Sequence, residues 1–421
     1  MTYAASLAQA LLPPKPPASR PLPPSSMPQP TPPTPSALGR WLSPSHVSAG
    51  FVTVLVGYTS SAAIVFEAAR AAGAGPAEIA SWLWALGLGM ALSCIGLSLR
   101  YRAPVLTAWS TPGAALLATS LHGVPMAQAL GVFVFASLLA ALAGFSGWFE
   151  RLMHRIPRAL AAGMLAGVLL EFGLGVFGAL QQHLLLVGAM LATLLAARRM
   201  LPRYAVALSF AVGLLVATLG GEWHLAVLPL RLTRPLWTTP SFAWSSLLGI
   251  GLPLFIVTMA SQNVPGIAML RTHGYQTPAS PLVGWTGLLG VVLAPFGGFS
   301  FNLAAITAAI CMSPEADPDP RQRWRAAVWA GGFYAITGLL GASVAALFAA
   351  FPHALVAAIA GLALLSTIGN SLQSALGDET WRDAALVTFL VTASGFSLGG
   401  VGSALWGLLL GLATAALTRR G

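Results

Sequence analysis

Charged residues are scarce in this chain of 421 residues. Aspartate, glutamate, lysine and arginine make up 8% of it, and lysine occurs once, at Lys15. A soluble domain carries about 25% charged residues, so this composition cannot cover a water-exposed surface. Hydrophobic residues make up 56% and the mean hydropathy is +0.78. Apolar runs of about 17–25 residues recur along nearly the whole length, without the strict alternation of an outer-membrane barrel. The sequence predicts an all-α polytopic membrane protein.

Several chemical motifs are also missing. The two cysteines, Cys94 and Cys311, lie inside apolar runs and fit small core residues better than a disulfide or a metal pair. We find no H-E-x-x-H zinc site, no P-loop, no G-x-S-x-G elbow and no pair of aspartates in the apolar runs. The net charge of +10 comes from dispersed arginines, which is typical of membrane topology signals. We therefore expect no cofactor, no metal and no nucleic acid, and an intramembrane enzyme is disfavoured.

The N-terminal segment, 1–40, differs from the rest of the chain. Its stretch "LLPPKPPASRPLPPSSMPQPTPPTPSALGR" is rich in proline and serine and poor in large apolar groups. Such a segment cannot bury enough surface to order itself, and it lacks the apolar centre of a secretory signal. Residues 1–40 are therefore expected to form a disordered cytoplasmic tail, with a proline-rich ligand for a partner as the alternative.

Apolar segments begin after Ser45, and fourteen can be placed. With the N-terminus in the cytoplasm, the inner connections, together with Arg40, Arg419 and Arg420 beside the first and last spans, hold sixteen arginines, and the outer connections hold three. This bias follows the positive-inside rule and predicts both termini in the cytoplasm of a bacterial inner-membrane protein. The fourteen ranges are 46–68, 78–98, 104–121, 124–147, 158–178, 183–200, 204–220, 245–270, 278–294, 299–312, 326–350, 353–374, 382–394 and 396–418.

The chain resembles itself at two places. "IPRALAAGMLAGVLL" from Ile156 matches "FPHALVAAIAGLALL" from Phe351, and "APVLTAWSTPGAA" from Ala103 matches "APFGGFSFNLAA" from Ala294. Both matches pair segments seven spans apart, and an odd offset inverts the second copy in the membrane. Two inverted halves are typical of secondary transporters. The halves are expected at 46–220 and 245–418, joined by an extracytoplasmic loop at 221–244.

Spans 3 and 10 carry residues that a plain spanning helix avoids. Non-helical backbone at membrane depth is tolerated where it is buried in protein or lines a cavity. We expect extended segments that enter from opposite sides, followed by half-helices that begin near Thr111 and Asn302. Ser110 and Ser300 stand where N-caps would lie. Two helix N-termini that point at one place favour an anion; a short kinked helix is the alternative for span 3.

"GYTSSAAI" from Gly57 and "RYRAPVLTAWSTPGAALL" from Arg100 resemble the bacterial benzoate:proton symporter family, within the uracil- and sulfate-transporter-like architecture. The resemblance covers nearly the whole chain after residue 40. It implies a core domain (46–147 plus 245–350), a gate domain (158–220 plus 353–418) and import of benzoate or a similar aromatic carboxylate by proton symport, with elevator-type alternating access. A carrier of another anion or a nucleobase is the alternative, and a passive channel is a more distant one.

The same resemblance implies a substrate site between spans 3 and 10, flanked by spans 1 and 8. Nucleobase carriers of this architecture have glutamates in spans 8 and 10, where this chain has amides and an aromatic ring, which suits a carboxylate. The expected site residues are Tyr58, Thr59, Ser60, Trp109, Ser110, Thr111, Ser261, Gln262, Asn263, Phe299, Ser300, Phe301 and Asn302.

Proton coupling needs a separate candidate. Glu171 is the one acidic residue well inside a predicted span, and an ionisable group at that depth is a functional hypothesis by default. A gate-interface acid is the alternative for Glu171, and His46, near the inner mouth of span 1, is a minor relay candidate. The expected partners are the aromatic acid, protons and the lipid bilayer, and a homodimer is left open.

Overall fold

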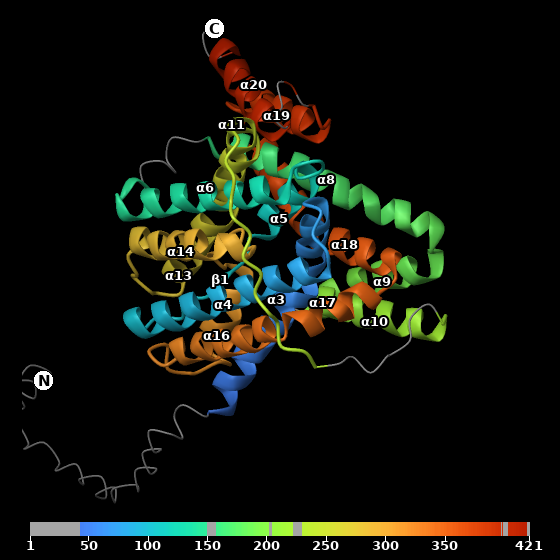
Figure 1. The fold of residues 1–421 in the computed structure, drawn as a ribbon, viewed down its shortest axis with the longest axis vertical. Coiled ribbons are helices and arrows are strands. Elements are labelled where there is room, and N and C mark those ends of the chain that lie inside the picture. The colour runs from blue at the N-terminus through green and yellow to red at the C-terminus, as the bar shows by residue number, and fades with distance from the viewer. Residues whose placement is uncertain are drawn as a thin grey trace, which may run out of the picture. The chain divides into compact units, whose positions relative to one another are not determined.

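Helices form nearly all of the described chain, and each of the fourteen predicted spans contains one (Figure 1). The computed structural model describes residues 43–149, 157–201, 204–221, 230–396, 398 and 403–418. All of them lie in the unit that begins at residue 42. The predicted tail at 1–40 and part of the loop at 221–244 lie outside the described residues.

The first half of the chain supplies seven helices that match the first seven predicted spans. They are α3 (Pro44–Ala71), α4 (Pro76–Tyr101), α5 (Thr111–Ser120), α6 (Met126–Phe145), α8 (Arg158–Gln182), α9 (Leu184–Met200) and α10 (Ala205–Leu219).

The second half repeats this order with more irregular helices. Span 8 is built from α11 (Trp244–Ser246), η2 (Leu247–Gly251), α12 (Leu252–Thr258), η3 (Met259–Asn263) and α13 (Val264–Thr272). The remaining elements are α14 (Ala279–Leu293), η4 (Ala294–Phe296), α15 (Ile306–Met312), α16 (Trp324–Leu339), α17 (Gly341–Ala350), α18 (His353–Leu376), α19 (Arg382–Ala393) and α20 (Ser403–Thr418).

Length and composition identify seven continuous helical stretches in the described part of the chain as able to cross a membrane. Helices α16 and α17 make an eighth span with a bend of 70°. Helices α5 and α15, with 10 and 7 residues, are too short to cross on their own. They are the helical parts of the two predicted broken spans.

Span 8 contains two π-helical turns, each followed closely by a proline. Pro253 comes shortly after η2, and Pro265 comes shortly after η3. Proline lacks the N–H of the i→i−4 bond and its ring crowds the carbonyl four residues earlier. A π turn precedes each proline. Single π turns inside α-helices are frequent at functional sites.

The broken spans meet through two short strands, β1 (Thr107–Ala108) and β2 (Asn302–Leu303). They pair antiparallel, with Thr107 opposite Leu303 and Ala108 opposite Asn302. One constant offset in residue number relates β1 to β2, and the same offset relates the start of α8 to the start of α18. The predicted inverted repeat and the extended backbone of both broken spans are confirmed.

One predicted helix start is wrong. Helix α5 begins at Thr111 as expected, but α15 begins at Ile306 and not near Asn302, which lies in β2. The sequence match of Ala103 with Ala294 implies a smaller offset than the one that relates β1 to β2, so it misplaces the second copy by about one helical turn. Ser300 is consequently not an N-cap, and Ala305 stands in the position that corresponds to Ser110.

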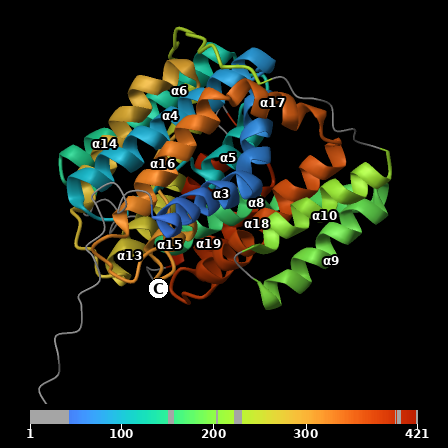
Figure 2. The same cartoon turned by 90° about the horizontal axis from the view of Figure 1, so that it is seen from below.

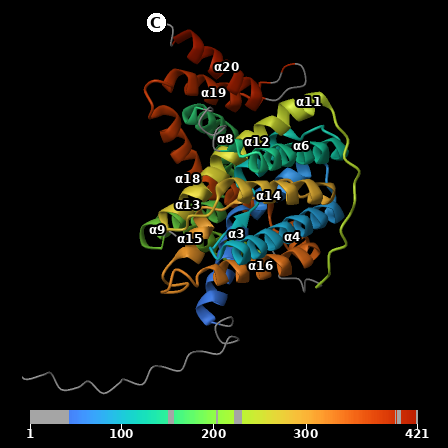
Figure 3. The same cartoon turned by 90° about the vertical axis from the view of Figure 1, so that its left-hand side faces the viewer.

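The helices pack in two groups. In the first, α6, α14, α4 and α16 form a layer in that order, with α3 and α5 against it (Figure 3). Gly87 and Gly338 let α4 and α16 approach closely: a Cβ on Gly87 would collide with the backbone of α16, and a Cβ on Gly338 would make a tight contact with Gly87. In the second group, α8 packs against α18 and α19, and α9 against α10 (Figure 2). We name α3–α6 and α11–α17 the core helices, and α8–α10 and α18–α20 the gate helices, after the two predicted domains, and the division into domains stays a prediction.

An extended segment at 230–243 runs across the core helices as a strap (Figure 1). Its backbone N–H groups donate to the carbonyls of Leu339, Pro295 and Ala127, over distances of 2.8–3.0 Å. Ser81 on α4 accepts the Leu236 N–H and donates to the Phe296 carbonyl. Each of these partners belongs to a core helix, so the strap ties one end of that group together.

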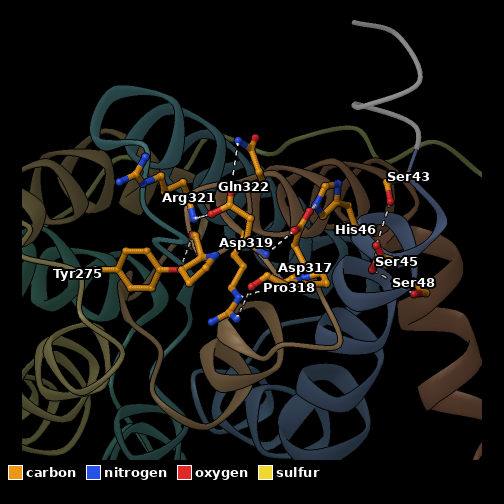
Figure 4. A network of polar contacts seen from close by, with 12 residues as sticks. Ser43, Ser45, His46, Ser48, Tyr275, Asp317, Pro318, Asp319, Arg321 and Gln322 are labelled. Carbon is orange, nitrogen blue, oxygen red and sulfur yellow. Dashed lines mark hydrogen bonds and ion pairs between the residues drawn. The ribbon is translucent and has the colours of Figure 1, made fainter. Parts of the chain in front are cut away.

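The loop after α15 is held at the opposite end of the core helices. His46 Nε2 lies 2.8 Å from an oxygen of the Asp317 carboxylate, and Tyr275 donates to the Pro320 carbonyl at 2.7 Å (Figure 4). Arg323 donates to the carbonyls of Asp317 and Met312, also at 2.7 Å. Burial raises the pKa of the Tyr275 phenol, which therefore stays a donor at neutral pH.

Candidate functional site

A cavity of about 1590 Å³ separates core from gate helices. Its core wall comes from the middle of α3, the start of α5, the η3 turn and the start of α15. Its gate wall comes from α8 and α18. The predicted site lies at this junction, because both broken spans and the π turn of span 8 converge there.

The cavity reaches one end of the helices. Arg158 and Ala205 line it at the starts of α8 and α10, and Arg198 and Arg271 line it near the ends of α9 and α13. The arginine bias predicts that these helix ends face the cytoplasm. The structure therefore has a one-sided vestibule, whose inner end lies at the broken spans.

Aromatic side chains close the inner end on the core side. Trp109 is 4% exposed, and its indole N–H donates to Ser61 Oγ at 2.8 Å. Tyr58 meets the Trp109 ring edge-on, with centroids 4.8 Å apart, and lies 6.4 Å from the Tyr334 ring. Trp109, Ser61 and Tyr334 line the cavity, and Tyr58 supports Trp109 from behind.

The start of α5 is stabilised as the sequence predicts. Ser110 is the N-cap, and its hydroxyl accepts the Gly113 N–H at 2.9 Å. Pro112 lies in the first turn, where its missing N–H has no intrahelical partner in any case. Thr111 and Pro112 line the cavity, whereas Ser110 is fully buried.

The side chains of three consecutive polar residues in the η3 turn point in two different directions. Ser261 and Gln262 line the cavity. Asn263 is fully buried and binds β2, donating to Asn302 Oδ1 at 2.9 Å and accepting the Leu303 N–H at 3.0 Å. Asn263 therefore fixes the second broken span and does not face the cavity.

The predicted residues of span 10 do not line the cavity. Phe299 is fully buried, with ring centroids 6.3 Å from Trp82 and 6.0 Å from Phe133. Phe301 packs against α4 at Gly89, and Asn302 donates to Ser300 on the same side. With the offset that relates β1 to β2 and α5 to α15, the positions corresponding to Trp109, Ser110 and Thr111 are Ala304, Ala305 and Ile306. Ala304, Ala305 and Thr307 line the cavity.

Two other predicted residues, Thr59 and Glu171, lie outside the cavity lining. Thr59 donates back to the Leu55 carbonyl at 2.8 Å, while Ser60 lines the cavity. Glu171 is exposed on α8 and does not line the cavity. Its role in proton coupling stays a prediction.

The sequence reasoning missed two sets of cavity residues. The arginines were interpreted as topology signals alone. The polar residues of span 12 recur every three or four positions, a spacing that places them on one helix face, and this signal was available in the sequence. These missed residues are Arg158, Arg198, Arg271, Ser366, Thr367, Asn370, Ser371 and Ser374.

The fold is shared with solved membrane transporters. The transmembrane domain of a cyanobacterial bicarbonate transporter, BicA, aligns with a TM-score of 0.55 and 14% identity, covering 88% of this chain and 96% of that one. Murine Slc26a9, an anion transporter solved in the inward-facing state, aligns with a TM-score of 0.57 and 14% identity, covering 89% and 68%. At this identity the likeness shows the fold of the chain, which is that of a multi-span helical membrane protein.

Sequence comparison identifies the family. Residues 40–417 match the BenE family, benzoate membrane transport protein. Inner membrane protein YdcO of Escherichia coli K12 is 51% identical over 370 residues, covering 88% of this chain and 95% of that one. The benzoate membrane transport protein of Acinetobacter baylyi is 38% identical over 368 residues, covering 87% and 93%. The chain belongs to the benzoate membrane transport protein family of bacterial transporters.

Proposed function

We propose that this protein imports benzoate or a similar aromatic carboxylate across the bacterial inner membrane by proton symport. The core helices carry the substrate past the gate helices in an elevator-type movement. Both termini lie in the cytoplasm, and the cavity is the inward-facing state of the carrier.

The observation that carries this proposal is the composition of the cavity wall. It combines the Trp109 indole with hydroxyls and an amide, among them Ser61, Ser261 and Gln262. Three arginines line it, and none of its described lining residues is acidic. Arginine recognises carboxylates through paired N–H donors, and an apolar ring gains from contact with an aromatic wall. A ring that bears one carboxylate matches both features.

The two groups of helices support an elevator-type movement. The strap and the loop after α15 join core helices at both ends, with hydrogen bonds of 2.7–3.0 Å. Rigid-body movement of one packed unit against another preserves such contacts. The site residues Trp109, Ser261 and Gln262 all belong to the core group, so they would move together with the substrate.

Uptake of radiolabelled benzoate into proteoliposomes tests this function. With an inward proton gradient we expect benzoate to accumulate above its external concentration, and without a gradient to equilibrate. Unlabelled aromatic acids should compete, and acetate should not. If the protein produces no saturable benzoate flux above that of protein-free liposomes, the proposal is wrong.

A further inference from the structure

We propose that the carboxyl group of the substrate itself carries the transported proton, so that the substrate crosses as the neutral acid and is ionised at the arginine-lined mouth of the cavity. This inference rests on the proposed function. The step is balanced: the carboxylate binds one proton outside, and the same O–H bond breaks inside, where the proton passes to water. One proton enters with each carboxylate, and no net charge crosses.

The first observation is what the cavity wall does not contain. Among the described residues that line it, none is an aspartate, a glutamate or a histidine. The ionisable groups that face it are the arginines of α8, α9 and α13 and the Tyr334 phenol of α16. Arginine and tyrosine do not exchange protons near neutral pH. A bound carboxylate is therefore the group in the cavity best placed to take up and release a proton.

The second observation is the difference between the two ends of the cavity. The inner end, at Trp109, Ser261 and Gln262, offers neutral donors and apolar surface. An anion loses hydration there without gaining a full opposite charge, and this favours the protonated acid. At the mouth, Arg158, Arg198 and Arg271 stabilise the ionised form. The wall thus favours protonation at the inner end and ionisation at the exit.

The third observation is where the arginines are attached. Arg158 and Arg198 belong to gate helices, whereas Trp109 and Gln262 belong to the core group. In an elevator-type movement the substrate meets the two gate arginines when the core helices reach the inward position. Ionisation then occurs on the inner side of the membrane, and the proton gradient sets the direction of net transport.

The acidic residues that the structure describes outside the cavity are less suited to carrying the transported proton. Glu171 is exposed on α8 outside the cavity. Asp317 already binds His46 at 2.8 Å in the loop after α15. Neither contacts the space through which the substrate would pass.

The test compares the pH profiles of substrates that differ in acidity. Saturable uptake into proteoliposomes is measured for benzoate and for ring-substituted benzoates of higher and lower acid pKa, and the flux into protein-free liposomes is subtracted. We expect the pH of half-maximal uptake to shift by about one unit for each unit of substrate pKa. The same midpoint for every substrate would assign the proton to a group of the protein and overturn the inference. Absence of saturable benzoate uptake at all pH values would instead refute the proposed function.

Two analogues sharpen the test. Benzenesulfonate stays ionised and should not accumulate in response to a proton gradient, whereas neutral benzamide should compete with benzoate. Gradient-driven accumulation of benzenesulfonate would contradict the inference. So would a Glu171→Gln variant that still binds benzoate but has lost accumulation, because the proton would then belong to Glu171.

The role of the arginines at the cavity mouth is tested by substitutions of Arg198, Arg158 and the neighbouring Arg199. Arg198 lines the cavity and Arg199 does not. Arg198→Gln and Arg158→Gln should lower benzoate uptake severalfold without an equal loss of equilibrium binding, because ionisation and release become slower. Arg199→Gln is the matched control. Equal uptake by all three variants would remove the arginines from the mechanism.

Discussion

The two broken spans share a backbone plan but not a set of side chains. Strands β1 and β2 pair symmetrically, and the offset that relates them also relates the starts of α5 and α15. In span 3 the positions around the helix start are Trp109, Ser110 and Thr111; in span 10 they are Ala304, Ala305 and Ile306. Span 3 therefore supplies an aromatic wall and a side-chain cap, and span 10 supplies two small residues, Ala304 and Ala305, that line the cavity. The inverted repeat fixes where the site lies, and its asymmetry fixes what can bind there.

The largest effect is expected for Trp109→Ala in the first broken span. The indole is buried, packs on Tyr58 and binds Ser61. Truncating a buried aromatic residue costs about 3–5 kcal/mol, so thermal unfolding in detergent should occur at a clearly lower temperature. The corresponding Ala304→Gly change in span 10 removes one methyl group and should have a much smaller effect. Equal shifts for the two variants would contradict the asymmetry.

Asn263→Ala should destabilise the second broken span. The change leaves the Leu303 N–H and the side-chain oxygen of Asn302 without their buried partner. Each such unsatisfied group costs about 1–3 kcal/mol, so we expect a loss of about 2–6 kcal/mol in unfolding free energy. Phe301→Ala should likewise affect stability and leave the preference for aromatic over aliphatic acids unchanged. A changed preference in a competition assay would show that Phe301 does contact the substrate.

Gln262→Ala should weaken benzoate binding by severalfold, up to about tenfold. A hydrogen bond to a neutral acid is worth about 0.5–1.5 kcal/mol, and about 1.4 kcal/mol is a factor of ten in affinity. Gln373→Ala is the matched control, because Gln373 is an exposed glutamine outside the cavity lining. Isothermal titration calorimetry measures the affinity of both variants for benzoate. Parent-like affinity in the Gln262 variant would exclude its amide from the site.

The smallest effect concerns the caps. Ser110→Ala removes the side chain that caps α5, which costs about 1 kcal/mol. Ala305→Ser offers no equivalent cap, because Ala305 has αR backbone angles whereas Ser110 is extended. We expect Ser110→Ala to lower the temperature of thermal unfolding and Ala305→Ser to change it little. Equal shifts for the two variants would contradict the comparison.

The sequence predicted the architecture more successfully than the site. Each of the fourteen ranges predicted from apolar length contains a helix, because the bilayer imposes apolar segments directly on the composition. The N-cap at Ser110 was also predictable, because serine is a preferred N-cap residue and the proline that follows Thr111 fits the first turn of a helix. These features depend on residues that are close together in the chain.

The missed features depend on distant segments. The match of Ala103 with Ala294 compares residue types alone, whereas the positions of β1 and β2, and of α5 and α15, give a longer offset between the two copies. The family resemblance implies a site that includes Phe299 and Phe301, although both pack on the α4 side. Arg198 was assigned to topology because no local pattern separates a cavity-facing arginine from its neighbour Arg199.

Cysteine protection tests most directly whether an aromatic carboxylate binds in this cavity. Cys94 and Cys311 are both fully buried, so a single introduced thiol can be labelled selectively. Thr367 lines the cavity from α18, and Gln373 lies on the same helix outside it. We predict that benzoate slows the reaction of Thr367→Cys with a thiol reagent severalfold, that acetate does not, and that Gln373→Cys is unaffected. Identical labelling of Thr367→Cys with and without saturating benzoate would contradict the account.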